Sequence, residues 1–271
     1  MGIKRGEVVA IWAAAVGAVA VGGAAFVRRL NHGRIRYAAV LNETLPVNSK
    51  WWREHAAVSG EILYVAMGDS AAQGIGATAP DRSYVGVIAG RIAQLTGRTV
   101  RTVNLSVSGA RVKDAVAVQL PAFRELAPDI VTVAIGANDV AEFEPAGFER
   151  DVRELFAALP PHAIVADLPY FYLPRNERTV AYANAVVRRL AREFGLTVAP
   201  LYRTTRHAGM RGALTLFAKD MFHPNDRGYR LWADAFTPAL DEALPLAMRS
   251  VDSRQEREHE PEQQGQPITG R

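Results

Sequence analysis

Short apolar runs alternate with longer amphipathic stretches through the middle of the chain. Five runs have the length and continuous hydrophobicity of buried strands, at residues 62–66, 99–105, 130–135, 163–166 and 196–198. Helical periodicity marks the segments between them, at residues 84–95, 112–126, 147–159 and 177–194. A last helix is expected to begin near Asp226, a good N-cap residue, and Pro238 is expected to kink or end it.

This alternation predicts the fold class. Strands that alternate with helices form a mostly parallel sheet with helices on both of its faces. We therefore expect a three-layer α/β/α sandwich with about five strands over residues 59–247. Because ligands of such sheets bind beyond the carboxyl ends of the strands, functional side chains are expected at that edge.

The N-terminal part carries a different pattern. Residues 8–27 form an uncharged run of 20 residues behind a basic N-terminus at residues 1–7. At roughly 1.5 Å per residue, a helix of this run would just cross a hydrocarbon core of roughly 30 Å. We interpret it as a transmembrane segment, either a signal anchor or an uncleaved signal. A cleaved signal peptide ending near Gly23-Ala24-Ala25 ranks second, because the run is long and arginines follow at once.

Orientation in the membrane stays open at this stage. Four arginines follow the run and Lys4 and Arg5 precede it. The positive-inside tendency then favours a cytoplasmic C-terminal side, whereas a short basic N-terminus also suits an exporting signal anchor. A margin of two charges does not decide which side of the membrane holds the globular domain.

Two polar segments flank the globular part. We interpret residues 28–58 as a juxtamembrane linker, in which Trp51 and Trp52 either lie at a membrane interface or pack on the domain. Residues 248–271 are rich in Gln, Glu, Arg and Pro, and we expect them to be a disordered polar tail.

Composition and charge narrow the possible functions. The net charge is +4, yet residues 59–247 hold 20 basic and 20 acidic side chains, so the excess belongs to the N-terminal end. Nucleic-acid binding therefore has no support. Because the chain has no cysteine, a disulfide framework, a thiolate metal site and a cysteine nucleophile are excluded.

A serine, a histidine and an acid stand where acyl-transfer chemistry would need them. Ser70 follows the first predicted strand, and His223 has Asp220 three residues before it. A serine hydroxyl is a poor nucleophile until a base takes its proton, and an acid on the other ring nitrogen holds that base in the right tautomer. The competing interpretation makes Ser70 a helix cap and Asp220 part of a helix-start cluster.

Groups able to stabilise an oxyanion follow successive strands. They are the backbone N–H of Ser70, the backbone N–H of Gly109 and the side-chain amide of Asn138. Taken singly, Gly109 is an ordinary turn glycine and Asn138 an ordinary helix cap. Their shared position beyond strand ends on one sheet edge favours a common site.

In this order the segments resemble those of the SGNH hydrolases, the GDSL esterase/lipase family. The first block is similar to Gly68-Asp69-Ser70, the second to Ser108-Gly109 after Asn104, the third to Gly136-Ala137-Asn138-Asp139 and the last to Asp220-Met221-Phe222-His223. The resemblance spans roughly residues 60–246. Two departures are Ala71, where leucine is frequent, and Arg111, where a small polar residue is common.

The resemblance implies a role for each residue. Ser70 would be the nucleophile, His223 the base and Asp220 its orienter, with an oxyanion hole from Ser70 N–H, Gly109 N–H and the Asn138 side chain. It implies a hydrolase that cleaves carboxylic esters without a metal or organic cofactor, acting on a small-molecule or lipid ester. The oligomeric state is left open.

Alternatives share the same scaffold. An acyltransferase or deacylase would use the same site on a lipid or sugar, and a membrane-anchored binding module would keep the fold without catalysis. The segment of residues 169–174, with its three aromatic side chains, follows the fourth strand. It either forms a wall of the substrate site or packs on a neighbouring helix.

Overall fold

The structure is a computed structural model that describes residues 40, 43–172 and 174–259. Its centre is a parallel sheet in the order β2-β1-β3-β4-β5. The strands are β1 (Ile62–Gly68), β2 (Val100–Asn104), β3 (Ile130–Ala134), β4 (Ile164–Ala166) and β5 (Thr197–Ala199). All five strands that the hydrophobic pattern predicts are confirmed, with ends shifted by one or two residues.

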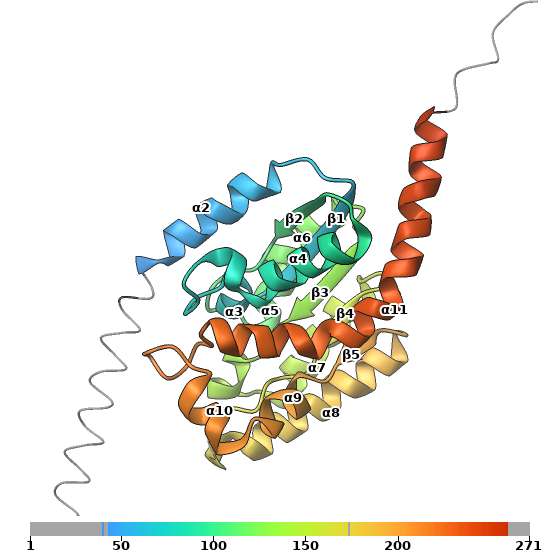
Figure 1. The fold of residues 1–271 in the computed structure, drawn as a ribbon. Coiled ribbons are helices and arrows are strands. Elements are labelled where there is room, and N and C mark those ends of the chain that lie inside the picture. Colours follow the sequence, from blue (N-terminus) through green and yellow to red (C-terminus); the bar gives the residue numbers. More distant parts are fainter. Residues whose placement is uncertain (1–39, 41–42, 173, 260–271) are drawn as a thin grey trace, which may run out of the picture.

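Helices cover both faces of the sheet (Figure 1). One face packs against α2 (Leu45–Ala56), α4 (Tyr84–Thr96) and α11 (Asp226–His259), and the other against α6 (Leu120–Arg124), α7 (Pro145–Ala157) and α8 (Glu177–Glu193). Successive residues of β1 alternate between the two cores: Tyr64 lies in the first and Val65 in the second. Since both faces are buried, the central strands β1, β3 and β4 are mostly apolar, whereas the edge strand β2 also carries Arg101, Thr102 and Asn104. The three-layer architecture is confirmed.

The stretch at residues 112–126 is not one regular helix. It consists of α5 (Val112–Asp114), the π-helical turn η2 (Ala115–Gln119) and α6. Pro121 has no N–H to give to the preceding turn, which favours a wider turn before it. The Gln119 amide bonds both backbone groups of Gly68 at the end of β1, at 2.9 Å and 2.8 Å.

Residues 45–56 are not a linker. They form α2, whose Trp52 is 3% exposed and belongs to the core beside α4. The Trp52 indole N–H and the Asn48 side chain both donate to the carbonyl of Gln73, at 3.1 Å and 3.0 Å. Because its indole is buried in the core, Trp52 packs on the domain and does not take the membrane-interface position that we considered for it. The globular domain therefore begins at least fourteen residues earlier than predicted, with Leu45 in place of residue 59.

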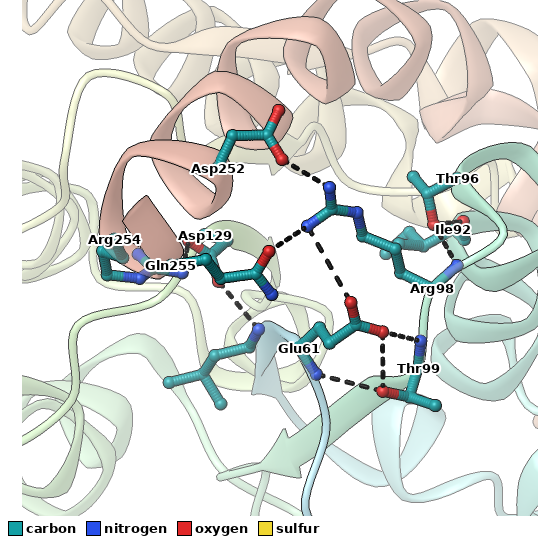
Figure 2. A network of polar contacts seen from close by, with 10 residues as sticks. Glu61, Ile92, Thr96, Arg98, Thr99, Asp129, Asp252, Arg254 and Gln255 are labelled. Atoms are coloured by element: carbon teal, nitrogen blue, oxygen red, sulfur yellow. Dashed lines mark hydrogen bonds and ion pairs between the residues drawn. The ribbon is translucent and has the colours of Figure 1, made fainter. Parts of the chain in front are cut away.

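The polar tail is ordered in its first half. Helix α11 does not end at Pro238; it passes through Pro238 and Pro245, bends along its length (Figure 1) and continues to His259. Val251 is buried in the core, and the neighbouring charged side chains have partners at the amino edge of the sheet (Figure 2). These contacts explain why a composition typical of disorder folds here.

Two ion pairs hold this end of α11. Arg254 contacts the buried carboxylate of Asp129 at 2.7 Å, and Arg98 pairs with Asp252. Asp129 also accepts the backbone N–H of Leu63 at 2.9 Å, which ties α11 to the start of β1. Among the described residues no helix combines the length and hydropathy of a membrane span. The segment at residues 8–27 lies outside the described residues, so its prediction stays untested.

Candidate active site

The serine lies at the carboxyl edge of β1, at the start of a short helix. Helix α3 (Ser70–Gln73) is capped by Asp69, whose carboxylate accepts the N–H of Ala71 at 2.9 Å. Ser70 is therefore not the cap residue that the competing interpretation required, and its hydroxyl bonds another group.

That group is a histidine 153 residues away in the chain. The Nε2 atom of His223 lies 2.9 Å from the Ser70 hydroxyl, and its Nδ1 atom lies 2.6 Å from the carboxylate of Asp220. The three side chains form one hydrogen-bonded series, although Ser70 is next to β1 and His223 precedes α11.

A tight turn lets Asp220 reach back to the histidine. Met221 has the left-handed φ of +57°, which is uncommon for a residue with a side chain. The second Asp220 oxygen accepts the N–H groups of Phe222 and His223, at 3.0 Å and 3.1 Å. Burial alone would raise the pKa of Asp220, but the hydrogen bonds from His223 and Phe222 outweigh it and lower that pKa. The carboxylate is thus held ionised beside the ring.

The loop after α3 supports the histidine from the other side. Gly76 has a φ of +95°, and a Cβ there would lie 2.5 Å from the carbonyl oxygen of Pro224 and 2.9 Å from the Cβ of His223. Tyr229 of α11 donates to the carbonyl of Ile75 at 2.6 Å. Only glycine permits this close approach between the two loops.

Asn138 lies beside Ser70, at the end of β3. Its side-chain NH₂ donates to the carbonyl of Ala110 at 3.0 Å and to the carboxylate of Asp69 at 3.3 Å. One proton therefore ties the loop after β3 to the loop after β2. The longer bond to Asp69 is the one that a substrate oxygen would replace if Asn138 donates to it.

The structure connects Gly109 to the site less directly than it connects Asn138. It has a φ of +78° in an exposed turn after β2, where only the backbone is present. The side chain of Asn104 braces this turn by donating to the carbonyl of Ala72 at 2.8 Å and accepting the N–H of Ser106 at 3.1 Å. Gly109 is not among the residues that line the cavity next to Ser70, whereas Asn138 is. Its role as an oxyanion donor stays a prediction.

Two buried acids near the site escaped the sequence argument. Burial raises the pKa of Asp69, which is 4% exposed, to about 6. Burial likewise raises the pKa of Asp139 to about 6, and Asp139 accepts the N–H of Val112 at 3.2 Å. Both stand inside the motif segments, yet their spacing gives no sign that they hold neighbouring loops together.

An apolar cavity opens beside the serine. Its wall contains Ser70, Asn138 and His223. The wall also contains six aromatic side chains, Tyr170, Phe171, Tyr172, Phe217, Phe222 and Trp232.

The aromatic segment after β4 fills both roles considered for it. Tyr170 and Tyr172 line the cavity, and they also pack on other elements. The Tyr170 ring meets Tyr202 of α9 (Leu201–His207) edge to face, and the Tyr172 hydroxyl donates to the carbonyl of Thr205 at 2.5 Å. The described residues contain no group of three His, Cys, Asp or Glu side chains arranged to hold a metal.

Comparison with known proteins identifies the family. Residues 66–231 match the model of the GDSL-like lipase/acylhydrolase family. The chain belongs to this family, and it is an enzyme that hydrolyses ester bonds. The resemblance drawn from the four motif segments is confirmed.

A curated protein and two solved structures are similar to this chain. The chain is 27% identical to the GDSL-like esterase Rv1075c of Mycobacterium tuberculosis over 233 residues, which cover 76% of this chain and 70% of that protein. Two solved structures share the fold: LAE5, an α/β hydrolase enzyme from the metagenome of Lake Arreo, and Axe2, an acetylxylan esterase from Geobacillus stearothermophilus. LAE5 has a TM-score of 0.58 at 23% identity, covering 68% of this chain and 97% of its own. Axe2 has a TM-score of 0.53 at 22% identity, covering 66% and 94%.

Proposed function

We propose that the protein is a serine esterase in which Ser70 attacks a carboxylic ester and forms an acyl-enzyme that water then hydrolyses. The observation that carries this proposal is the hydrogen-bonded series from Ser70 through His223 to Asp220, with spacings of 2.9 Å and 2.6 Å. Nδ1–H bonded to a carboxylate leaves Nε2 unprotonated, so that it can accept the serine proton.

The reaction follows from these positions. Nε2 of His223 takes the Ser70 proton as the oxygen bonds the ester carbon, and the same proton then goes to the departing alcohol. The Asp220 carboxylate stabilises the imidazolium that forms in between. The negative oxygen is proposed to be stabilised by the N–H groups of Ser70 and Gly109 and by the Asn138 side chain, which would exchange its 3.3 Å bond to Asp69 for one to substrate.

The test combines labelling and turnover on the full-length protein. We expect an alkyl fluorophosphonate to modify Ser70 and the wild type to hydrolyse p-nitrophenyl esters. Ser70→Ala should abolish labelling and lower kcat by about 10³-fold or more. Ser253→Ala is the control, because the Ser253 hydroxyl donates to the carbonyl of Arg249 in α11, away from the site. A Ser70→Ala variant with the wild-type rate would rule out the proposal.

We further propose that residues 8–27 attach the enzyme to a membrane. An uncharged run of 20 residues followed at once by arginines supports this. The full-length protein should then stay with membranes after extraction at alkaline pH, and a variant lacking residues 8–27 should not. Recovery of the full-length protein in the extract would contradict the attachment.

A further inference from the structure

Four large apolar side chains are exposed on the two segments that flank the cavity residues Leu216 and Phe217 in the chain. Met210 and Leu214 belong to α10 (Gly209–Thr215), and Met221 and Phe222 belong to the loop before His223. Met210 and Leu214 are 76% and 77% exposed, more than any other exposed large apolar residue of the described part of the chain. Met221 and Phe222 are 48% and 45% exposed. We refer to these four residues as the apolar rim.

The rim is continuous with the active site. Leu216 and Phe217 follow α10 directly and line the cavity, as Phe222 does. Asn225 joins the two parts of the rim, because its side chain donates to the carbonyls of Thr215 and Phe217 at 3.0 Å and 2.9 Å. Met210 and Leu214 are four residues apart, so they lie on the same face of α10. Phe222 both lines the cavity and is exposed, and the segment that carries Met210 and Leu214 continues into the cavity wall at Leu216 and Phe217.

The exposed charges on the segment that carries α10 have one sign. Residues 194–219 contain Arg203, Arg206, Arg211 and Lys219, all exposed, and no Asp or Glu. None of the ion pairs between described residues involves Arg203, Arg206 or Arg211. Some arginines elsewhere in the domain do form ion pairs, as Arg98, Arg153 and Arg188 do.

We propose that the apolar rim docks on an anionic lipid surface and brings the mouth of the catalytic cavity to the membrane. Exposed Met, Leu and Phe side chains bordered by unpaired arginines are the combination that enters the headgroup layer, where apolar side chains leave water and cations meet lipid phosphates. A cavity with an aromatic wall that opens within this surface is suited to an ester whose apolar chain lies in the lipid. This use of the docked surface rests on the proposed ester hydrolysis, whereas the docking itself does not.

The absence of cysteine makes docking measurable residue by residue in the full-length protein. Leu214→Cys, labelled with an environment-sensitive fluorophore, reports on the rim. Leu95→Cys is the matched control: Leu95 is 53% exposed in the last turn of α4, which ends just before β2 begins and so lies at the opposite edge of the sheet. A tether at residues 8–27 would bring both labels near the membrane, but only docking would insert one of them.

With vesicles of phosphatidylglycerol and phosphatidylcholine, we expect a blue shift of the Leu214→Cys label and none of the Leu95→Cys label. Adding Met210→Ser, or Arg203→Gln with Arg211→Gln, should weaken partitioning by about tenfold. High salt should have the same effect as removing the arginines. An unshifted Leu214→Cys label, as expected if the rim binds a protein instead, overturns the proposal. Equal shifts at both positions, or equal shifts with pure phosphatidylcholine, also overturn it.

A kinetic measurement separates docking from catalysis. Met210→Ser with Leu214→Ser should lower the hydrolysis of a vesicle-borne ester by about tenfold and leave that of a soluble p-nitrophenyl ester unchanged. Failure of the wild type to hydrolyse the soluble ester would reject the proposed function while the label results still decide docking. Equal rates of the double variant and the wild type on the vesicle-borne ester would reject the role of the rim in substrate access.

Discussion

Replacing Asp220 by asparagine should inactivate the enzyme by holding His223 in the wrong tautomer. One Asp220 oxygen accepts the backbone N–H groups of Phe222 and His223, and the other accepts Nδ1–H. An asparagine must keep its only oxygen toward the two backbone groups, because the reversed amide would place NH₂ against both donors. Its NH₂ then faces Nδ1, which has to accept, and the ring proton moves to Nε2.

The size of the effect follows from this geometry. A ring protonated at Nε2 cannot take the Ser70 proton over the 2.9 Å that separates them. The imidazolium formed in the reaction also loses its carboxylate. Together these losses are expected to lower kcat by about 10³–10⁴-fold, which is about 4–5 kcal/mol in the barrier.

The assay compares kcat and KM for a short p-nitrophenyl ester at pH 7.5. Asp220→Ala is the variant to compare with Asp220→Asn, because it removes the carboxylate but leaves the ring free to adopt either tautomer. The asparagine variant keeps the bonds to the backbone and so should fold like the wild type, yet be no more active than the alanine variant. An asparagine variant within tenfold of the wild-type kcat would refute the reasoning.

Three further changes test how the site is supported. Gly76→Ala should lower stability and activity together, because its Cβ would meet a backbone carbonyl at 2.5 Å. Gly90→Ala, in open space on α4, should instead stabilise the protein by roughly 0.5–1 kcal/mol. Equal melting temperatures of the two variants would contradict this. The pKa of Asp69 is raised from 3.8 to about 6, so the folded wild type resists ionisation and loses stability as pH rises through this range. The free energy of unfolding of Asp69→Asn should therefore increase relative to that of the wild type by about 3 kcal/mol between about pH 4 and pH 6. Urea unfolding of both proteins at pH 4 and pH 7 measures this difference, and a constant difference would be inconsistent with a raised pKa. Arg254→Ala should lower the free energy of unfolding by about 1–3 kcal/mol, because it leaves the buried Asp129 carboxylate without its cation. Amide hydrogen exchange near residue 251 should become faster. Unchanged exchange would show that this end of α11 is not held by the ion pair.

The residues proposed for catalysis could be identified from the chain because each lies in a short segment with its own chemistry. Ser70, Asn138 and the Asp220–His223 pair follow strands or precede a helix, and parallel strands bring their carboxyl ends to one edge. The 2.9 Å contact between Ser70 and His223 is consistent with that expectation. Gly109 occupies the expected loop, but its place in the site depends on backbone orientation, which residue type does not encode.

The wrong predictions have a common origin. Residues 45–56 and 248–259 are polar enough to suit a linker and a tail, yet both pack on the domain. In each, a few side chains find partners elsewhere in the chain: Trp52 of α2 and Val251 of α11 are buried in the core, and Arg254 of α11 pairs with the buried Asp129. Local composition measures the average tendency to leave water, and a single buried side chain hardly changes that average.

Strand positions, the order of layers and the side chains proposed for catalysis could be read from the chain, since hydrophobic period and motif chemistry are local properties. The contacts that hold those side chains in place could not be read from the chain. The bonds of Gln119 to Gly68, the contact of Gly76 with the histidine loop and the burial that raises the pKa of Asp69 all join residues that are distant in sequence or depend on what surrounds them. Such features arise only when separate segments pack together, because distance, dielectric environment and hydrogen-bond partners are properties of the folded arrangement.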